Sequence, residues 1–151
     1  MSDLSDKTPS FETDQWLIAK SEEAGLPMIF RMRREVPPGI IPQEYPYLIN
    51  IYWRYEDASN NGLPTELLLK QMGELEVRLD RIEGFDNGFM VLSITGNQRK
   101  EWIWYVCDKQ VFMEKLNLAL VGAEPFPIEL QAANDPKWNN FTSLLANVRK
   151  Q

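Results

Sequence analysis

Hydrophobic and polar residues alternate near the start of the chain, which is the pattern of β-strands. In residues 27–35 the side chains alternate: Met28, Phe30 and Met32 are predicted to point inward, and Ile29, Arg31 and Arg33 outward. Another β-like run covers residues 15–23, and Ala-Gly-Leu separates the two runs. The pattern therefore predicts a β-hairpin with a glycine-containing turn.

The next segment, residues 36–46, contains four prolines and predicts a stiff connector. Proline lacks a backbone N–H group and restricts φ, so the segment suits neither a helix nor a central strand. Two interpretations stay open: a rigid crossover between two edges of the domain, or an ordered loop that carries function. The pattern does not decide whether this loop lies against the domain or projects from it.

The central part of the chain predicts six elements in the order β-α-β-β-α-β. Strands are indicated at residues 47–56, 88–95, 99–108 and 126–130. The first helix begins at Pro64 or Thr65 and ends near residues 84–88. Its apolar positions recur on one face of a 3.6-residue period: Leu68, Leu75, Leu79 and Ile82. The second helix begins after Asp108 as N-cap and runs to about Val121.

A last helix is predicted near the C-terminus. Asp135 has a side chain suited to the N-cap, and Pro136 suits the first helical position. The apolar residues of this helix recur on one side: Trp138, Phe141, Leu145 and Val148. The motif therefore predicts that Asp135 caps the helix, Pro136 starts it and Trp138 anchors it.

This order of elements predicts the α+β class. The central six elements form the ferredoxin-like split βαβ core, in which two helices cover one face of an antiparallel sheet. A β-hairpin precedes this core and a C-terminal helix follows it. Residues 1–13 are polar and show no hydrophobic period, so we expect a flexible leader followed by one α+β domain over residues 14–150.

Strand alternation divides the predicted sheet into two faces. The face under the helices is assigned Ile49, Ile51, Trp53, Met90, Leu92, Ile94, Trp102, Trp104, Val106, Phe126, Ile128 and Leu130. The opposite face is assigned Asn50, Tyr52, Arg54, Val91, Ser93, Thr95, Glu101, Ile103, Tyr105, Glu129 and Gln131. Both tryptophans of the stretch RKEWIWYVCD at residues 99–108 are thus expected in the core.

The opposite face is the candidate binding surface, with Asn50, Tyr52, Arg54, Glu101 and Tyr105 as its central residues. Two arrangements stay open. Either the hairpin or the C-terminal helix covers this face and makes a second core layer, or part of the face stays open and binds a partner. Arg54 and Glu101 are expected to pair with each other or to contact a ligand.

Composition and charge narrow the classes of partner. The chain has 151 residues, 44% of them hydrophobic, and a formal net charge of -6. An acidic chain repels phosphate backbones, so nucleic acid is not an expected partner. A protein with a basic surface is the expected one, and we expect a monomer or a weak homo-dimer.

Candidate chemistry is limited because the chain contains no histidine and one cysteine. Without imidazole, the usual zinc ligand sets and the Ser-His-Asp and Cys-His arrangements are excluded, and no metal or cofactor is expected. Cys107 is expected to be an inert thiol, and the carboxylates Glu56 and Asp57 a solvated strand end. The polar N-terminus and the lack of an apolar run of ~20 residues predict a cytoplasmic protein with no membrane segment.

A resemblance to a known family rests on three stretches. NIYWRYED followed by GLP, TGNQRKEWIWYVCD and the closing DPKWNNF resemble the bacterial family called domain of unknown function 695, over roughly residues 14 to 148. The resemblance implies a small cytoplasmic α+β protein with no established activity. The closing motif is also similar to one in the regulator of ribonuclease E activity B, a small acidic protein that binds and inhibits a nuclease. This singles out Asp135, Pro136 and Trp138, with Phe141 where tyrosine is expected.

Three functional hypotheses follow from these patterns. The first is a non-catalytic protein-binding or regulatory module, such as an inhibitor or immunity protein, that binds a basic partner. The second is a small enzyme that uses carboxylate, tyrosine and arginine side chains in a cleft on the sheet face. The third is a protein that self-associates through a sheet edge. A concave pocket with convergent titratable groups favours the enzyme, and a flatter patch favours the binding module.

Overall fold

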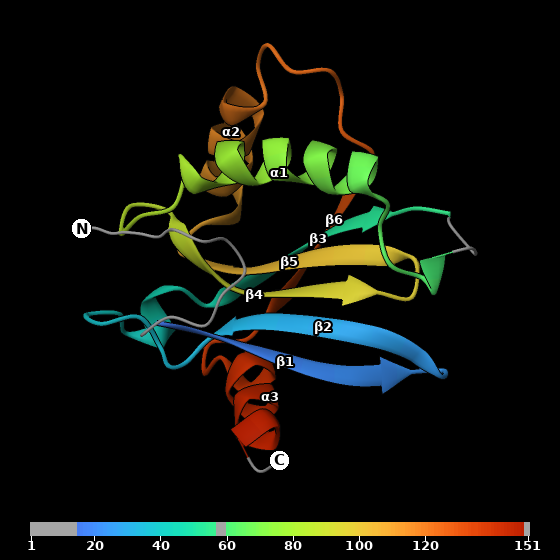
Figure 1. The fold of residues 1–151 in the computed structure, drawn as a ribbon. Helices are drawn as coiled ribbons and strands as arrows, with labels where there is room; N and C mark the ends of the chain where they lie inside the picture. The colour runs from blue at the N-terminus through green and yellow to red at the C-terminus, as the bar shows by residue number, and fades with distance from the viewer. Residues whose placement is uncertain (1–14, 57–59, 150–151) are drawn as a thin grey trace, which may run out of the picture.

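Helices cover both faces of an antiparallel sheet (Figure 1). The computed structural model describes residues 15–56 and 60–149, and in these ranges the sheet has six strands. The elements are β1 (Trp16–Glu23), β2 (Leu26–Arg33), a 3-10 turn (Pro42–Glu44), β3 (Tyr47–Arg54), α1 (Glu66–Asp80), β4 (Gly88–Gly96), β5 (Arg99–Val106), α2 (Lys109–Ala119), β6 (Ile128–Asn134) and α3 (Asn139–Arg149). The predicted α+β class is confirmed. The leader predicted over residues 1–13 lies outside the described ranges.

The strands lie in the order β1-β2-β4-β5-β3-β6. The last four have the order of the ferredoxin-like fold, in which β5 lies between β3 and β4 and pairs antiparallel with both. The hairpin of β1 and β2 extends this sheet, because β2 pairs antiparallel with β4. The predicted core topology and the N-terminal hairpin are therefore both present.

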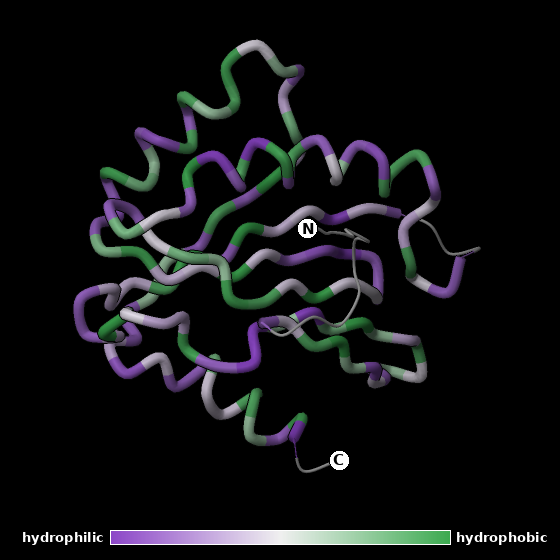
Figure 2. Tube along the Cα trace, turned by 60° about the vertical axis from the view of Figure 1, so that its left-hand side comes forward, coloured by the Kyte–Doolittle hydropathy of each residue, from purple (hydrophilic) through white to green (hydrophobic). Residues whose placement is uncertain are grey.

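The helix starts follow the predicted capping chemistry. The side chain of Thr65 accepts a hydrogen bond from the Leu68 amide at 3.2 Å, and Asp108 accepts one from the Val111 amide at 3.0 Å. Helix α1 ends at Asp80, earlier than predicted. Along α1, hydrophobic and hydrophilic residues alternate as in an amphipathic helix (Figure 2).

Gly73 lies in the middle of α1, and a methyl group built on it meets nothing within 4 Å. We expect Gly73→Ala to raise the free energy of unfolding by about 0.5–1 kcal/mol, because alanine loses less backbone entropy in a helix. Urea denaturation followed by tryptophan fluorescence measures this difference. If the variant is less stable than the wild type, the space around Gly73 does not accommodate a methyl group and the prediction is wrong.

The first core lies between the sheet and helices α1 and α2. Trp102 and Trp104 are fully buried in it, as predicted. Its other buried members are Ile49, Ile51, Trp53, Tyr55, Met72, Leu75, Leu79, Val106, Phe112 and Leu116. Burial of the large aromatic side chains of this core, Trp102 and Trp104 among them, contributes several kcal/mol at about 25 cal/mol per Å² of apolar area.

A second core lies between the sheet and α3. Tyr105, Trp138 and Phe141 form its aromatic centre, and all three are at most 1% exposed. The other buried members are Leu17, Met32, Ile40, Tyr45, Val91, Leu92 and Leu145. Helix α3 therefore makes a second core layer over part of this face, as in the first of the two arrangements that the sequence left open.

A β-bulge in β4 changes the predicted faces. The register shifts between Met90 and Leu92, so that Leu92 pairs with Ile103, a residue on the α3 side of β5. The prediction that Leu92 and Ile94 lie under α1 and α2 is therefore wrong, since both pack in the second core. The extra residue reverses the alternation for the rest of the strand.

Side chains of β2 are also buried on both faces of the sheet. Arg33, predicted to point outward, is 9% exposed. Its Nε donates to the Met90 carbonyl at 2.7 Å, and its Nη2 lies 3.2 Å from Oε2 of Glu83, just after α1. The outward prediction for Arg33 is wrong because the sheet continues past β4 and the end of α1 reaches over it.

The proline-rich loop of residues 36–46 lies against the body of the protein. Ile40 and Tyr45 are buried, and the Tyr45 hydroxyl donates to the Phe85 carbonyl at 2.7 Å. The indole N–H of Trp138 donates to the Tyr45 carbonyl at 2.9 Å. The loop thus helps to hold α3 against the sheet.

The C-terminal segment differs from the prediction in two details. Strand β6 begins at Ile128, so Phe126 precedes it and packs on Trp53 at a centroid distance of 5.8 Å. Helix α3 begins at Asn139, and Pro136 therefore lies in a turn outside the helix. Trp138 in this turn has a φ of 58°, which directs the chain from the turn into the helix.

Candidate functional site

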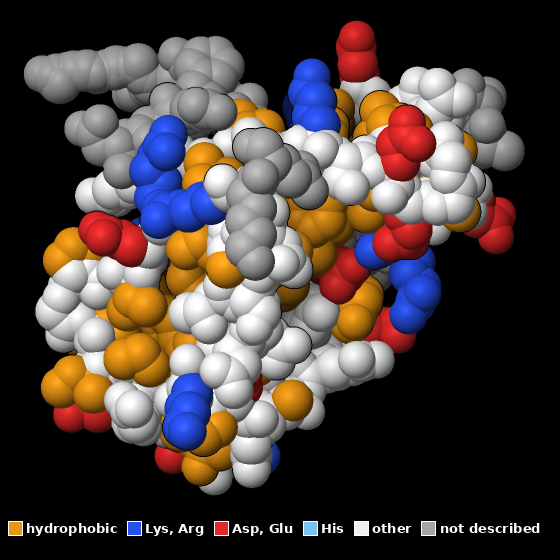
Figure 3. All heavy atoms as spheres, turned by 90° about the horizontal axis from the view of Figure 1, so that it is seen from below, with side chains coloured by type: hydrophobic (Ala, Val, Ile, Leu, Met, Phe, Trp, Pro, Cys, Tyr) orange, Lys and Arg blue, Asp and Glu red, His pale blue; other side chains and the backbone are white. Residues whose placement is uncertain are grey.

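Helix α3 covers only one end of its sheet face. Toward the turn between β4 and β5, this face keeps a group of partly buried side chains together with the buried Glu101 and the exposed Arg54. We call this group the uncovered sheet face: Phe30, Asn50, Tyr52, Arg54, Ile94, Arg99, Glu101 and Ile103. Figure 3 shows the face from below, with charged side chains of both signs gathered beside apolar ones. It spans β2, β4, β5 and β3.

A continuous polar network crosses this surface. The Asn50 amide donates to Oε1 of Glu101 at 2.9 Å, and Nε of Arg99 donates to Oε2 of Glu101 at 2.8 Å. Arg99 also contacts Glu23 with Nη1 at 3.2 Å and Nη2 at 3.3 Å. Asn97 donates to the same Glu23 carboxylate at 2.7 Å. The network therefore links β3 and β5 to the end of β1.

Arg99 crosses the sheet beside a glycine at the end of β4. Gly96 has a φ of 142°, and a Cβ there would lie 2.4 Å from the Pro27 carbonyl oxygen and 2.7 Å from Sδ of Met28. The Arg99 guanidinium lies over this strand end, where Nη1 donates to the Gly96 carbonyl at 3.1 Å. The absence of a side chain at Gly96 thus allows the close approach of β2 to this end of β4.

Electrostatics keep the network charged. Burial of Arg99 acts to lower its pKa, but hydrogen bonds and charge from Glu101 and Glu23 outweigh it and raise the pKa above the ordinary value. The pKa of Glu23 is lowered, chiefly by the hydrogen bond from Asn97; desolvation opposes this shift and Arg99 adds to it. Because Glu101 is 6% exposed, its pairing with Arg99 is shielded from solvent.

Tyr52 and Arg54 form the more exposed part of the surface. The Arg54 guanidinium lies 5.4 Å from the centre of the Tyr52 ring, and its Nε lies 3.6 Å from Oε2 of Glu129 on β6. The Arg54 and Glu129 side chains are 62% and 64% exposed, so this pair adds little to stability. The expected pairing of Arg54 with Glu101 is wrong: Arg54 reaches Glu129, and Glu101 holds Arg99.

Tyr105, the fifth predicted surface residue, lies inside the second core. Its ring stacks on Trp138 with a centroid distance of 4.3 Å and an interplanar angle of 11°. Its hydroxyl donates to Oδ2 of Asp135 at 2.7 Å, and burial followed by this carboxylate raises the Tyr105 pKa. Tyr105 is therefore a structural residue, and solvent reaches the predicted surface at Asn50, Tyr52 and Arg54.

Asp135 joins this buried tyrosine to the start of α3. Its carboxylate accepts hydrogen bonds at 2.9 Å from the backbone amides of Asn139 and Asn140, and a third from the Asn140 side chain. Burial acts to raise the Asp135 pKa, but these bonds and the one from Tyr105 hold it below the ordinary value. The closing motif thus caps and anchors α3, as the sequence predicts for Asp135 and Trp138.

The stretches on which the family resemblance rests belong to the sheet and to the start of α3. The model of the family of unknown function DUF695 matches residues 14–146. This chain belongs to the DUF695 family. A comparison of this DUF695 protein with the curated proteins found no match, and neither did a comparison with the solved structures. The similarity to the regulator of ribonuclease E activity B stays a prediction.

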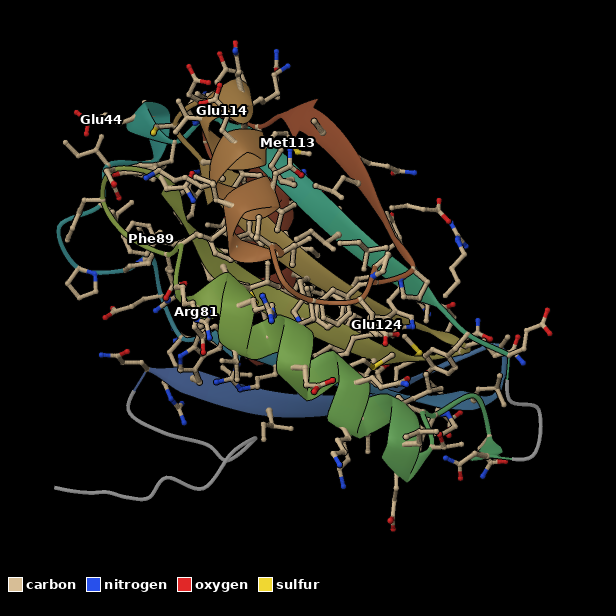
Figure 4. All side chains as sticks on the ribbon, turned by 90° about the horizontal axis from the view of Figure 1, so that it is seen from above. Glu44, Arg81, Phe89, Met113, Glu114 and Glu124 are labelled. Carbon is tan, nitrogen blue, oxygen red and sulfur yellow. The ribbon has the colours of Figure 1, made fainter. Side chains whose placement is uncertain are left out.

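A groove of about 960 Å³ lies on the helix-covered side of this DUF695 protein, between α1 and the segment that joins α2 to β6. Figure 4 shows this side, with Arg81 at the end of α1 and Glu124 in the joining segment. Arg78 bridges the two walls, since its Nη1 donates to the carbonyls of Ala119 at 2.9 Å and Val121 at 3.0 Å. A deep polar pocket around Tyr52, Arg54, Glu101 and Tyr105 would favour the enzyme hypothesis, and of these four residues Arg54 alone lines this groove.

The described residues were compared with the requirements of a metal site and of a membrane-spanning helix. Within residues 15–56 and 60–149, no three Asp, Glu or Cys side chains come together as a possible metal site. No helix in the same part of the chain is long and apolar enough to cross a membrane.

Several residues of the uncovered sheet face were absent from the sequence prediction. Arg99 was detectable, because it lies two positions before Glu101 and therefore on the same face of one strand. Phe30 and Ile94 were not detectable from the sequence. The pairing of the hairpin with β4 brings Phe30 to the uncovered sheet face, and the bulge in β4 brings Ile94 to it. The groove also lacked a sequence signal beyond the loop composition of residues 122–127.

Proposed function

We propose that this DUF695 protein is a cytoplasmic, non-catalytic module that binds another protein through the uncovered sheet face. One observation carries the proposal: α3 covers one end of its sheet face, and Phe30, Ile94 and Ile103 at the margin of the second core stay partly accessible beside the polar network. An apolar surface with paired charges beside it is the usual composition of a protein–protein interface. Sheet strands hold these side chains, so little ordering is required on binding.

The charge of the protein indicates the chemistry of the partner. The chain carries a net charge of -6, and the Glu23 and Glu129 side chains at opposite sides of the uncovered sheet face are 49% and 64% exposed. A partner with a basic surface gains from both, and long-range attraction speeds its association. We therefore expect binding that weakens as salt is added.

The test compares two double variants with the wild type as bait in soluble lysate of the source organism. Tyr52→Ala/Glu129→Lys changes the uncovered sheet face. Leu118→Ala/Glu114→Lys makes matching changes at exposed positions of α2, outside the groove, and serves as control. Circular dichroism and thermal melting first establish that both variants fold.

We expect one basic protein to bind stoichiometrically to the wild type and the control, and the sheet-face variant to bind it more than tenfold more weakly. Removing a tyrosine from an interface commonly has effects of that size. Two outcomes contradict the proposal: equal binding by all three baits, and loss of binding in the control alone.

A further inference from the structure

Strand β6 ends the sheet with few of the features that usually protect an edge, because Glu129 is its only charged residue. Among the strands of residues 15–56 and 60–149 it pairs with β3 alone, and Figure 4 shows it as the outermost strand away from the hairpin. Its sequence, IELQAAN, contains no proline and no lysine, and its register with β3 is regular from Ile128 to Asn134. Protected edges carry such residues or a bulge. The opposite edge strand, β1, contains Lys20 and Glu22.

The hydrogen-bonding groups that face outward from β6 follow from its register. The Asp135 amide donates to the Pro46 carbonyl at 2.8 Å, which continues the pairing of Asn134 with Tyr47. Since backbone groups alternate along a strand, the odd-numbered residues of β6 bond to β3 and the even-numbered ones face the open edge. The amide of Ile128 is already used, because it donates to the Phe126 carbonyl at 2.8 Å.

We propose that β6 pairs antiparallel with β6 of a second copy of this chain, with Gln131 opposite Gln131 at the two-fold axis. This register pairs all seven residues of the strand, and it matches outward-facing residues with outward-facing ones. Leu130 and Ala132 exchange both backbone hydrogen bonds with Ala132 and Leu130 of the second copy. The result is one continuous sheet through both copies.

The side chains of β6 are self-complementary in this register. Half-buried Leu130 faces the small Ala132, and Glu129 faces Ala133, so no like charges lie opposite each other. The axis passes between two neutral Gln131 side chains. Repulsion between two chains of net charge -6 opposes the association, so added salt strengthens it. This salt dependence is the reverse of that expected for the basic partner, and the inference does not rest on the proposed function.

The first test removes a backbone hydrogen-bond donor from the outer edge of β6. Sedimentation equilibrium of the full chain, over a wide concentration range at low and high salt, measures the monomer–dimer equilibrium. We expect a reversible dimer favoured by salt, and its loss in Ala132→Pro. Proline at this edge position removes an outward N–H group and leaves the bonds to β3 intact. Circular dichroism establishes that this variant folds.

The second test places charged side chains at the proposed two-fold axis. Gln131→Glu and Gln131→Lys each place like charges opposite each other, so each is expected to dimerise about fivefold more weakly. An equimolar mixture of the two restores association, because Glu then faces Lys. Ala133→Lys, which faces Glu129, is the matched control and is expected to dimerise at least as well as the wild type.

Four results overturn the inference. They are a wild type that stays monomeric at every concentration and salt level, an Ala132→Pro variant that dimerises normally, a mixture no more associated than its components, and a different protein that occupies β6 in place of a second copy.

Discussion

Trp138→Ala is expected to lower the free energy of unfolding by about 4 kcal/mol, the largest effect predicted for a single substitution in this protein. The Trp138 ring is fully buried between Tyr105 and Phe141, and its indole N–H donates to the Tyr45 carbonyl. Its removal leaves a cavity between the sheet and α3 and an unpaired carbonyl. Urea denaturation followed by circular dichroism measures the change.

The backbone conformation of Trp138 also predicts how the alanine and glycine variants at this position differ in stability. Its φ of 58° lies in the left-handed region, where a side chain costs roughly 1 kcal/mol relative to glycine. We therefore expect Trp138→Gly to be less destabilising than Trp138→Ala by about that amount, although glycine is usually the worse residue elsewhere. If Trp138→Gly is the less stable of the two variants, the left-handed backbone conformation assigned to Trp138 is wrong.

Asp135→Ala is expected to lower the free energy of unfolding by roughly 3 kcal/mol. The substitution removes the cap of α3, worth about 1 kcal/mol, and leaves the buried Tyr105 hydroxyl without its acceptor, which costs about 1–3 kcal/mol. Tyr105→Phe is the matched control, because it removes the same hydroxyl bond and keeps the cap. It is expected to cost about 1 kcal/mol. Equal effects of the two variants contradict the capping role.

The lowered pKa of Asp135 also predicts a pH dependence. A carboxyl group whose pKa is lower in the folded state stabilises the protein above its unfolded pKa of about 3.9 and loses this contribution as the pH falls below it. The stability difference between the wild type and Asp135→Asn is therefore largest near neutral pH and shrinks in the acid range. Urea titrations at several pH values measure it. A difference that grows toward acid pH contradicts the assignment.

The proposed protein-binding surface and the proposed dimer are geometrically compatible. A two-fold axis through Gln131 is perpendicular to the sheet, so the uncovered sheet faces of both copies open in the same direction. Glu129 lies on β6 and borders the uncovered sheet face through its pairing with Arg54. A partner with two basic surfaces would then bind both copies at once and gain affinity from the second contact.

Local pattern was enough to predict the elements, their order and the class of fold. Alternation and the 3.6-residue period are properties of neighbouring residues, and caps such as Thr65 and Asp108 act within one helical turn. The split βαβ topology then follows from connection rules. The burial of Trp102 and Trp104 was predictable for the same reason, since both lie on the apolar side of a strand in a sheet covered by α1 and α2.

Tertiary contacts decided which part of the candidate surface stays accessible. Tyr105 is buried and Tyr52 half-exposed because α3 docks at one end of the sheet, where Trp138 and the proline-rich loop hold it. That position depends on side chains far apart in the chain. Likewise, one extra residue in β4 moves Leu92 and Ile94 to the α3 face. A bulge costs little in local backbone energy, so the packing of both sheet faces together selects it, and no local pattern reveals it.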